Sequence, residues 1–266
     1  MPNVLDLFKL DGKVSLVTGG GRGLGFFSAE ALAEAGSNVA ICGRDLHGKL
    51  DIAIAKLKET GRDCIAIKCD ITNEDEVRQM VEKMKDYYGK CDILVNNAGI
   101  GDISPSKSMS LKRWNEILNT NLTGAFLCCR EFGKLMIKQN FGNIINFSSE
   151  NGQVGFAIGM AAYATTKIGI IGLTRSLAVE WGKYNIRVNA ILPGNMEEGM
   201  MEMLKDKNGA FYKTYGEQIL RKIPLKRFGD SDAIKGAIVF LASDASRYIS
   251  GANILVDAGF TINAGL

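Results

Sequence analysis

Apolar positions along the chain fall into seven short runs, which alternate with longer segments of helical periodicity. The runs are rich in valine and isoleucine and carry few charges, which is typical of strands buried on both faces of a parallel sheet. We expect strands near residues 13–18, 38–43, 63–68, 92–96, 142–147, 186–192 and 253–257. We expect helices near residues 23–35, 46–60, 73–88, 111–138, 161–183 and 230–242.

This alternation predicts a single α/β domain over residues 1–266, with a doubly wound, seven-stranded parallel sheet of the Rossmann type and helices on both faces. The intervening helices are long enough to connect parallel strands. Ligands of such sheets bind beyond the carboxyl ends of the strands, so we expect the chemistry in the segments that follow them. No linker, repeat or low-complexity segment divides the sequence.

The first expected strand leads directly into TGGGRGLG at residues 18–25, and an apolar helical pattern follows as far as Gly36. A glycine-rich turn at this place brings backbone N–H groups to a pyrophosphate at the helix N-terminus. The spacing is T-G-x-x-x-G-x-G, with Gly19, Gly23 and Gly25, and it differs from the common G-x-G-x-x-G spacing. The flanking strand and helix favour nucleotide binding over a flexible loop.

A second chemical feature is the pair Tyr163 and Lys167 in AAYATTKIGIIGL. Residues four apart lie on the same face of a helix, about one turn from each other. An ammonium group there favours phenolate over phenol, so we expect Lys167 to lower the pKa of Tyr163 and make it a general acid or base. Alone, the pair is more typical of an ordinary surface helix; the glycine-rich turn near the N-terminus reverses that interpretation.

With these two features and several others in the same order, the chain resembles a classical short-chain dehydrogenase/reductase over roughly residues 10 to 260. The further matches are DIT beginning at Asp70, NNAG at 96–99, NTNLTG around Asn121, INFSS at 145–149, LPG at 192–194 and ISGANILVDAG at 249–259. The resemblance implies hydride transfer between a nicotinamide and a carbonyl or secondary alcohol.

The resemblance also implies four catalytic roles. Tyr163 would be the acid or base, and Lys167 would lower its pKa and hold a ribose hydroxyl. Ser149 would stabilise charge on the substrate oxygen, and Asn121 would help hold a water that carries the proton away. Ser148 competes with Ser149, but the family pattern S-x-x-G favours Ser149, because Gly152 follows three residues later.

The positions that the resemblance assigns to the cofactor follow the ends of the expected strands. They are Gly19, Arg22, Gly23, Leu24, Gly25, Arg44, Asp70, Ile71, Asn97, Ala98, Gly99, Tyr163, Lys167, Pro193, Gly194 and Met196. Asp70 would lie against the adenine. Gly43 stands where NAD-preferring members often have an acidic residue, and Arg44 follows it. This favours NADP, because guanidinium groups bind phosphate in bidentate geometry, with NAD possible because Asp45 is close.

Residues 195–222 interrupt the alternation with a Met-rich amphipathic segment at the place of the family's substrate lid. An ordinary pair of packed helices is the alternative. Many members carry a Thr four residues after the proline of the PG pair, where this chain has Glu197. A contact to the nicotinamide amide would then come from elsewhere, for example from the Met196 backbone, or be missing.

For the substrate, IPLKRFGD and LFKLDGKVSLVTGG resemble the gluconate 5-dehydrogenase and polyol branch, which implies a sugar acid, keto-sugar or polyol. Glu150 and Asn151, next to the expected active site, would contact such a substrate or form a solvated turn. The alternative is a 3-oxoacyl-(acyl-carrier-protein) reductase, which would need a basic patch for its acidic carrier. Candidates for that patch are Arg113, Lys222, Lys226 and Arg227.

A non-catalytic dinucleotide-binding redox sensor is a third hypothesis, but such a sensor would be expected to lack Tyr163 or Lys167.

Charge and composition narrow the remaining classes. The net charge of +3 is spread along the chain, so no nucleic-acid partner is expected. There is no signal peptide pattern and no run of 18 apolar residues, so we expect no membrane association. Six cysteines without a C-x-x-C pair favour free thiols in the cytoplasm. His47 is the one histidine, so neither a His-rich metal site nor a Ser-His-Asp triad is expected.

Assembly is implied by the resemblance, since family members commonly pair two long helices, here expected at 111–138 and 161–183. The stretch IGIIGLTRSLAVEW is more apolar than a helix packed on one face requires. We therefore expect a homotetramer or homodimer.

Overall fold

The computed structural model describes residues 3–44 and 48–264 of the chain. Its centre is one sheet of seven parallel strands in the order β3-β2-β1-β4-β5-β6-β7. The strands are β1 (Val14–Thr18), β2 (Asn38–Gly43), β3 (Cys64–Lys68), β4 (Ile93–Asn96), β5 (Gly142–Phe147), β6 (Ile186–Pro193) and β7 (Asn253–Val256). The predicted doubly wound parallel sheet is confirmed, and its strand order reverses between β1 and β4.

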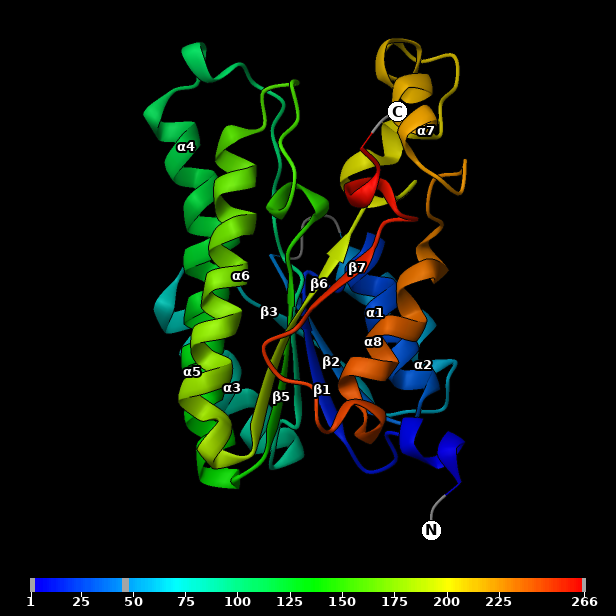
Figure 1. Cartoon of the computed structure of the whole chain (residues 1–266). Helices are drawn as coiled ribbons and strands as arrows, with labels where there is room; N and C mark the ends of the chain where they lie inside the picture. Colours follow the sequence, from blue (N-terminus) through cyan, green and yellow to red (C-terminus); the bar gives the residue numbers. More distant parts are fainter. Residues whose placement is uncertain (1–2, 45–47, 265–266) are drawn as a thin grey trace.

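Helices cover both faces of the sheet (Figure 1). One layer holds α3 (Glu74–Tyr88), α4 (Leu111–Leu118), α5 (Gly124–Gln139) and α6 (Ala161–Trp181). The other layer holds α1 (Gly23–Glu34), α2 (Lys49–Lys58) and α8 (Lys235–Ala242). The short α7 (Glu217–Lys222) stands apart from both layers, near the C-terminus of the chain (Figure 1).

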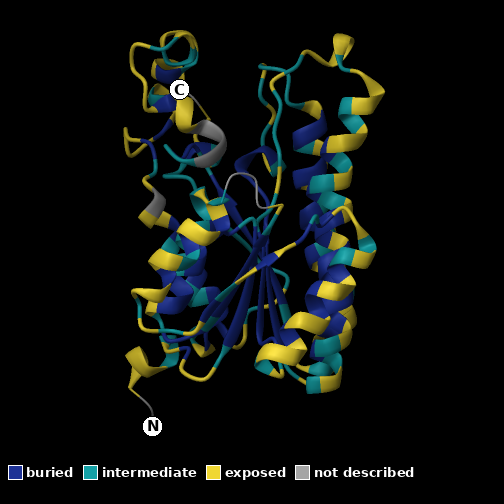
Figure 2. Cartoon of the chain, turned by 180° about the vertical axis from the view of Figure 1, so that it is seen from behind, coloured by how far each residue is buried: buried dark blue, intermediate teal, exposed yellow. Residues whose placement is uncertain are grey.

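The strands alternate their side chains between two apolar cores, one under each helical layer. Leu16 and Ile144 enter the core beneath α3, α5 and α6, whereas their neighbours Val17 and Ile145 enter the core beneath α1, α2 and α8. Figure 2 shows the result: buried strands lie between helices whose outer faces are exposed. Because helices cover both faces of the sheet, a ligand is left to bind at the carboxyl ends of the strands.

Three helical expectations need correction at their ends or middle. The helix expected over 111–138 is two α-helices joined by a π-helical turn, Asn119–Thr123. This wider turn accompanies the inward Asn121 side chain, which bonds the backbone of Ile100. The helix expected over 46–60 is described from Lys49, and the one expected over 230–242 opens with a 3-10 turn, Ser231–Ile234.

The Met-rich segment 195–222 contains a 3-10 stretch, Gly199–Leu204, a π-helical turn, Tyr212–Gly216, and α7. It packs into a small apolar cluster of its own, separate from the two main cores. The buried members of this cluster are Leu204, Ile219, Ile223, Phe228 and Phe260. The segment expected to be a substrate lid is therefore held by a local core over the carboxyl side of the sheet.

Among the described residues, no helix is long and apolar enough to cross a bilayer. All six cysteines are buried and free of disulfide bonds. Burial raises the pKa of each thiol.

Candidate active site

A cleft of about 580 Å³ runs along the carboxyl edge of the sheet. It is lined by the turns that follow β1, β2, β3, β4, β5 and β6, together with the first turns of α6 and part of the lid segment. Every residue that the sequence assigned to catalysis or to the cofactor lines this cleft, with the exception of Asn121. The site thus gathers residues from positions 19 to 196 of the chain.

The glycine turn after β1 lies at one end of the cleft, and its glycines are required by backbone geometry. Gly19 and Gly23 have φ angles of +68° and +54°, which favour glycine. A Cβ on Gly25 would overlap the Gly19 carbonyl oxygen and the Asn97 side chain. No side chain caps the N-terminus of α1, so its first N–H groups face the turn without a side-chain partner. This end of the cleft fits a pyrophosphate.

Hydrogen bonds tie this turn to the turn after β4, across the point where the strand order reverses. The Thr18 hydroxyl oxygen accepts from the backbone N–H groups of Asn97 and Ala98, each at 3.0 Å. The Asn97 side chain donates to the Thr18 carbonyl oxygen at 3.0 Å. The two turns therefore form one braced unit, on which a nucleotide would lie.

Basic side chains flank the turn after β2. Arg22 and Arg44 line the cleft there, as expected, and so does Lys49 at the start of α2. Lys49 was not among the expected residues, because it lies outside every family motif. Asp45 and His47 fall outside the described residues, so the expectation that depends on Asp45 stays open.

The turn after β3 is where we expect Asp70 to lie against the adenine of the cofactor. Asp70 and Ile71 line the cleft beside Cys69. The Asp70 carboxylate accepts from the Thr72 backbone N–H at 2.9 Å and from the Thr72 hydroxyl at 2.8 Å. These bonds fix the turn, so that Asp70 lies at the wall of the cleft in a defined orientation.

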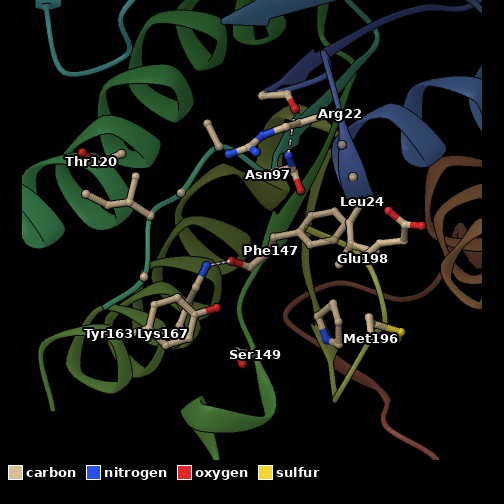
Figure 3. A pocket seen from close by; sticks show the side chains of 18 of the residues that line it. Arg22, Leu24, Asn97, Thr120, Phe147, Ser149, Tyr163, Lys167, Met196 and Glu198 are labelled. Atoms are coloured by element: carbon tan, nitrogen blue, oxygen red, sulfur yellow. Dashed lines mark hydrogen bonds between the residues drawn. The ribbon is translucent and has the colours of Figure 1, made fainter. Parts of the chain in front are cut away.

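At the middle of the cleft, Ser149, Tyr163 and Lys167 lie together, and all three are buried. Ser149 follows β5, whereas the other two lie in the first two turns of α6 (Figure 3). The Lys167 ammonium donates to the Phe147 carbonyl oxygen at 2.8 Å, and its Nζ lies 5.3 Å from the centre of the Tyr163 ring. The face of α6 predicted from the spacing is therefore the face that lines the cleft.

The two candidate serines have different partners. The Ser148 hydroxyl donates to the Lys167 carbonyl oxygen at 2.8 Å and braces α6 against β5. The Ser149 hydroxyl accepts from the Asn151 backbone N–H at 3.2 Å and interacts with Tyr163 in the cleft. This difference favours Ser149 as the group that contacts a substrate oxygen.

The predicted lowering of the Tyr163 pKa is not found in this structure. Burial raises the pKa of Tyr163 to about 12, hydrogen bonding from Ser149 opposes this, and the charge of Glu150 adds to it. Burial also lowers the pKa of Lys167 to about 8, because a buried ammonium loses its hydration. Tyr163 is therefore held as a phenol, the form that can donate a proton to a carbonyl oxygen.

Asn121 lies behind the cleft rather than in it. Its side chain accepts from the Ile100 N–H and donates to the Ile100 carbonyl oxygen, each at 2.8 Å, and donates to Thr166 at 3.2 Å. All of these side-chain bonds brace the turn after β4 against α6. A water relay at this place would use the backbone of the π-helical turn and not the side chain.

The substrate end of the cleft has a polar wall and an apolar wall. Glu150 and Asn151 are buried, so the solvated turn considered from the sequence is wrong. Asn195 donates to the Glu150 carboxyl oxygen at 2.7 Å, and the Asn151 side-chain oxygen has no partner among the described residues. Four apolar side chains also line the cleft, namely Phe156, Ile158, Met160 and Ile219. These four and Asn195 carry no motif, and only their position after strands or in the lid could have indicated them.

The start of the lid segment is fixed by backbone pairing. Met196 pairs with Gly229 in an isolated parallel bridge, and the Glu197 N–H donates to the Gly229 carbonyl oxygen at 2.8 Å. Glu198, and not the Glu197 singled out from the sequence, lines the cleft (Figure 3). Glu198 forms an ion pair with Lys205. Gly229 bonds the backbone of the two residues that flank Met196, Asn195 and Glu197. The N–H and carbonyl groups of Met196 itself therefore point away from Gly229, toward the cleft.

The relatives found by comparison with known proteins agree with one another. A family model described as enoyl-(acyl carrier protein) reductase matches residues 19–261. The chain is 39% identical over 247 residues to the 3-oxoacyl-(acyl-carrier-protein) reductase FabG of Staphylococcus aureus, covering 93% of this chain and 97% of that protein.

Solved structures agree in fold. A short-chain type dehydrogenase/reductase from Mycobacterium marinum superposes with a TM-score of 0.90 at 36% identity, covering 97% of this chain and 99% of the other. A gluconate 5-dehydrogenase from Burkholderia cenocepacia, solved in complex with NADP and tartrate, superposes with a TM-score of 0.91 at 32% identity. That match covers 98% of this chain and 99% of the other.

Proposed function

The chain belongs to the short-chain dehydrogenase/reductase family, and on this premise we propose that it is an NADP-dependent enzyme acting on a sugar acid, keto-sugar or polyol. The reaction interconverts a secondary alcohol and a ketone. The observation that carries the proposal is the buried Tyr163 between Ser149 and Lys167, on the wall of a cleft whose other end fits a pyrophosphate.

The residues divide the reaction between them. The bound nicotinamide supplies or accepts the hydride. In carbonyl reduction, Tyr163 gives its proton to the substrate oxygen, where negative charge develops, and Ser149 donates a hydrogen bond to the same oxygen. Lys167 would hold a ribose hydroxyl of the cofactor, and its positive charge would stabilise the Tyr163 phenolate. In alcohol oxidation the same proton moves back to Tyr163.

NADP is proposed because the cleft is basic where a ribose 2′-phosphate would lie. Arg22, Arg44 and Lys49 line that end, and no acidic residue ends β2 at Gly43. The gluconate 5-dehydrogenase neighbour was solved with NADP. NAD remains the second cofactor to test.

A polyhydroxylated substrate is supported by the polar wall of the cleft. The buried Asn151 oxygen, which has no partner among the described residues, and the Asn195 amide offer hydrogen bonds to hydroxyl groups. The carrier-protein patch expected for the alternative is weakened, because Arg113 pairs with Asp102 and Glu116. Arg227 likewise lies 3.8 Å from Asp230.

A 3-oxoacyl-(acyl-carrier-protein) reductase is the second candidate. It is favoured by the relative at 39% identity and by the apolar wall at Phe156, Ile158 and Met160, against which an acyl chain would pack. The two substrate classes differ in the group beside the reacting carbon, so one assay that includes substrates of both classes separates the two candidates.

We also propose a homotetramer or homodimer in the cytoplasm. Large apolar side chains on the outer faces of α5 and α6 support assembly, namely Phe126, Ile168 and Val179. Six buried free thiols support a reducing compartment. Light scattering at micromolar concentration tests the assembly, and a monomer would contradict it.

The function is tested by steady-state assay of the purified protein with NADPH and NADH. The panel contains 5-ketogluconate, other keto-sugars and an acetoacetyl thioester. Tyr163→Phe should abolish turnover, whereas Tyr248→Phe, at a fully exposed tyrosine, should retain it. Turnover that survives in Tyr163→Phe refutes the acid role. Tight cofactor binding without any turnover would favour the redox sensor.

A further inference from the structure

Glu150 is a buried carboxyl group next to the catalytic serine that the proposed reaction does not use. It begins the 3-10 turn Glu150–Gly152 directly after Ser149, and only 3% of its surface is exposed. One carboxyl oxygen accepts from the Asn195 amide at 2.7 Å. The other, Oε2, has no hydrogen-bond partner among the described residues. A buried carboxylate with a single amide donor is poorly stabilised as an anion.

A second carboxyl group lies against the same piece of backbone. A Cβ on Gly194 would come within 2.8 Å of both Glu150 Oε2 and the Asp257 side chain, so the two acids pack on one glycine. Asp257 accepts from the Gly259 N–H at 3.0 Å, the Thr261 N–H at 2.9 Å and the Thr261 hydroxyl at 2.7 Å. Three donors stabilise the charge of Asp257, and one amide serves Glu150.

Glu150 is buried and Asp257 partly buried against the same glycine, so each carboxyl group opposes ionisation of the other. Glu150 has one hydrogen-bond donor where Asp257 has three, so Glu150 is the group whose charged form is stabilised less. In agreement, burial first, and then the charge of Asp257, raise the pKa of Glu150 to about 8, against the opposing bond from Asn195.

The charge state of Glu150 reaches the catalytic tyrosine. The titratable groups that interact with Glu150 are Asp257 after β7 and Tyr163 on α6; its partner from the β6 side, Asn195, is neutral. With Glu150 neutral, the Tyr163 phenolate forms without this neighbouring negative charge; with Glu150 ionised, two like charges oppose each other.

We propose that Glu150 is a positioning residue for proton transfer: it is a neutral acid in the working enzyme, and its loss of a proton opposes formation of the Tyr163 phenolate. The proposal rests on the proposed dehydrogenase function. Alcohol oxidation needs the phenolate as the base, so ionisation of Glu150 slows oxidation at alkaline pH.

The kinetic test compares alcohol oxidation by the wild type and Glu150→Gln between pH 6.5 and pH 9.5. Glutamine has the shape of the neutral acid and cannot ionise. We expect the kcat/KM of Glu150→Gln to exceed that of the wild type several-fold at pH 9.5, and the ratio between them to fall toward pH 6.5. Glu180→Gln removes a charge from the exposed part of α6 and should follow the wild-type profile. A ratio that does not change with pH overturns the proposal.

A second measurement does not depend on activity. The folded chain keeps a proton on Glu150 that the unfolded chain releases above the ordinary glutamate pKa, so wild-type stability falls as pH rises toward 8. The melting temperature of Glu150→Gln relative to wild type should therefore rise from pH 5 to pH 8.5. A constant difference would mean that Glu150 is ionised in the fold, which also overturns the proposal. Absence of wild-type turnover would instead refute the proposed function, and this inference with it.

Discussion

The two ends of the cleft are built on different physical principles. At the cofactor end, the turn 18–25 is fixed by glycine backbone geometry and by hydrogen bonds between Thr18 and the turn after β4. At the substrate end, the lid packs on a separate cluster of aromatic and apolar side chains. The first end tolerates almost no added atom, whereas the second can repack around ligands of different shape. A family can thus keep one cofactor and change its substrate.

The strongest test of this contrast lies between the two ends, at Lys167. Lys167→Met should lower kcat/KM by at least about 10³-fold, because the ammonium that supports Tyr163 is lost. The same change should raise stability at pH 7 by about 1–3 kcal/mol, since a buried charge is removed. Lysine with its pKa lowered to about 8 destabilises the fold while charged, so the gain shrinks as pH rises from 8 toward 10.5.

Both outcomes are measured on one preparation, by assay and by thermal melting across pH 6 to 10. A loss of stability at pH 7 would show that the bond from Lys167 to Phe147 outweighs the desolvation of the ammonium. The contrast between the two ends of the cleft would then have to include a structural role for Lys167, which lies between them.

Next in size is a matched pair of glycine changes in the cofactor turn. Gly25→Ala places a methyl group against the Gly19 carbonyl oxygen and should weaken NADPH binding by about 10²-fold or prevent folding. Gly21→Ala meets its nearest neighbour, Leu50, at 3.3 Å and should bind within about threefold of wild type. Fluorescence titration with NADPH measures both, and equal affinities would contradict a turn limited by backbone contact.

The cofactor end could be predicted from sequence because its determinants are local. Gly19, Gly23 and Gly25 sit between a strand and a helix that the apolar pattern already indicates, so spacing and structure agree. The Tyr163 and Lys167 pair follows equally from helical periodicity. The predicted pKa relation failed because burial is a property of the whole fold, and four-residue spacing carries no information about desolvation.

The substrate end was predicted only as a region. Phe156, Ile219 and Phe260 come together from three distant parts of the chain, and no local pattern connects them. The neutral state of Glu150 depends in the same way on Asp257, which lies 107 positions further along the sequence. The π-helical turn at Asn121 also escaped prediction, because it is set by a bond to Ile100 and not by propensity.

A smaller effect is expected at the phosphate end. Arg44→Ala should raise the KM for NADPH by about tenfold and leave the KM for NADH within about twofold, because Arg44 is exposed and contributes a screened contact. Steady-state assays with both cofactors measure the ratio. A parallel change in both would mean that Arg44 contacts a part that the two cofactors share, and the NADP proposal would lose its main support.

The smallest effect separates the lid cluster from the main core. Phe260 stacks on Phe156 with ring centres 5.6 Å apart, and Phe156 lines the cleft. Phe260→Leu should raise the substrate KM about three- to fivefold while the NADPH dissociation constant stays unchanged, since an aromatic pair contributes about 0.5–1.5 kcal/mol. Phe132→Leu, in the core beneath α5, should instead lower the melting temperature and leave the substrate KM unchanged. If both changes acted on stability and on KM alike, the lid cluster would be part of one cooperative core, and the two ends of the cleft would differ in chemistry but not in rigidity.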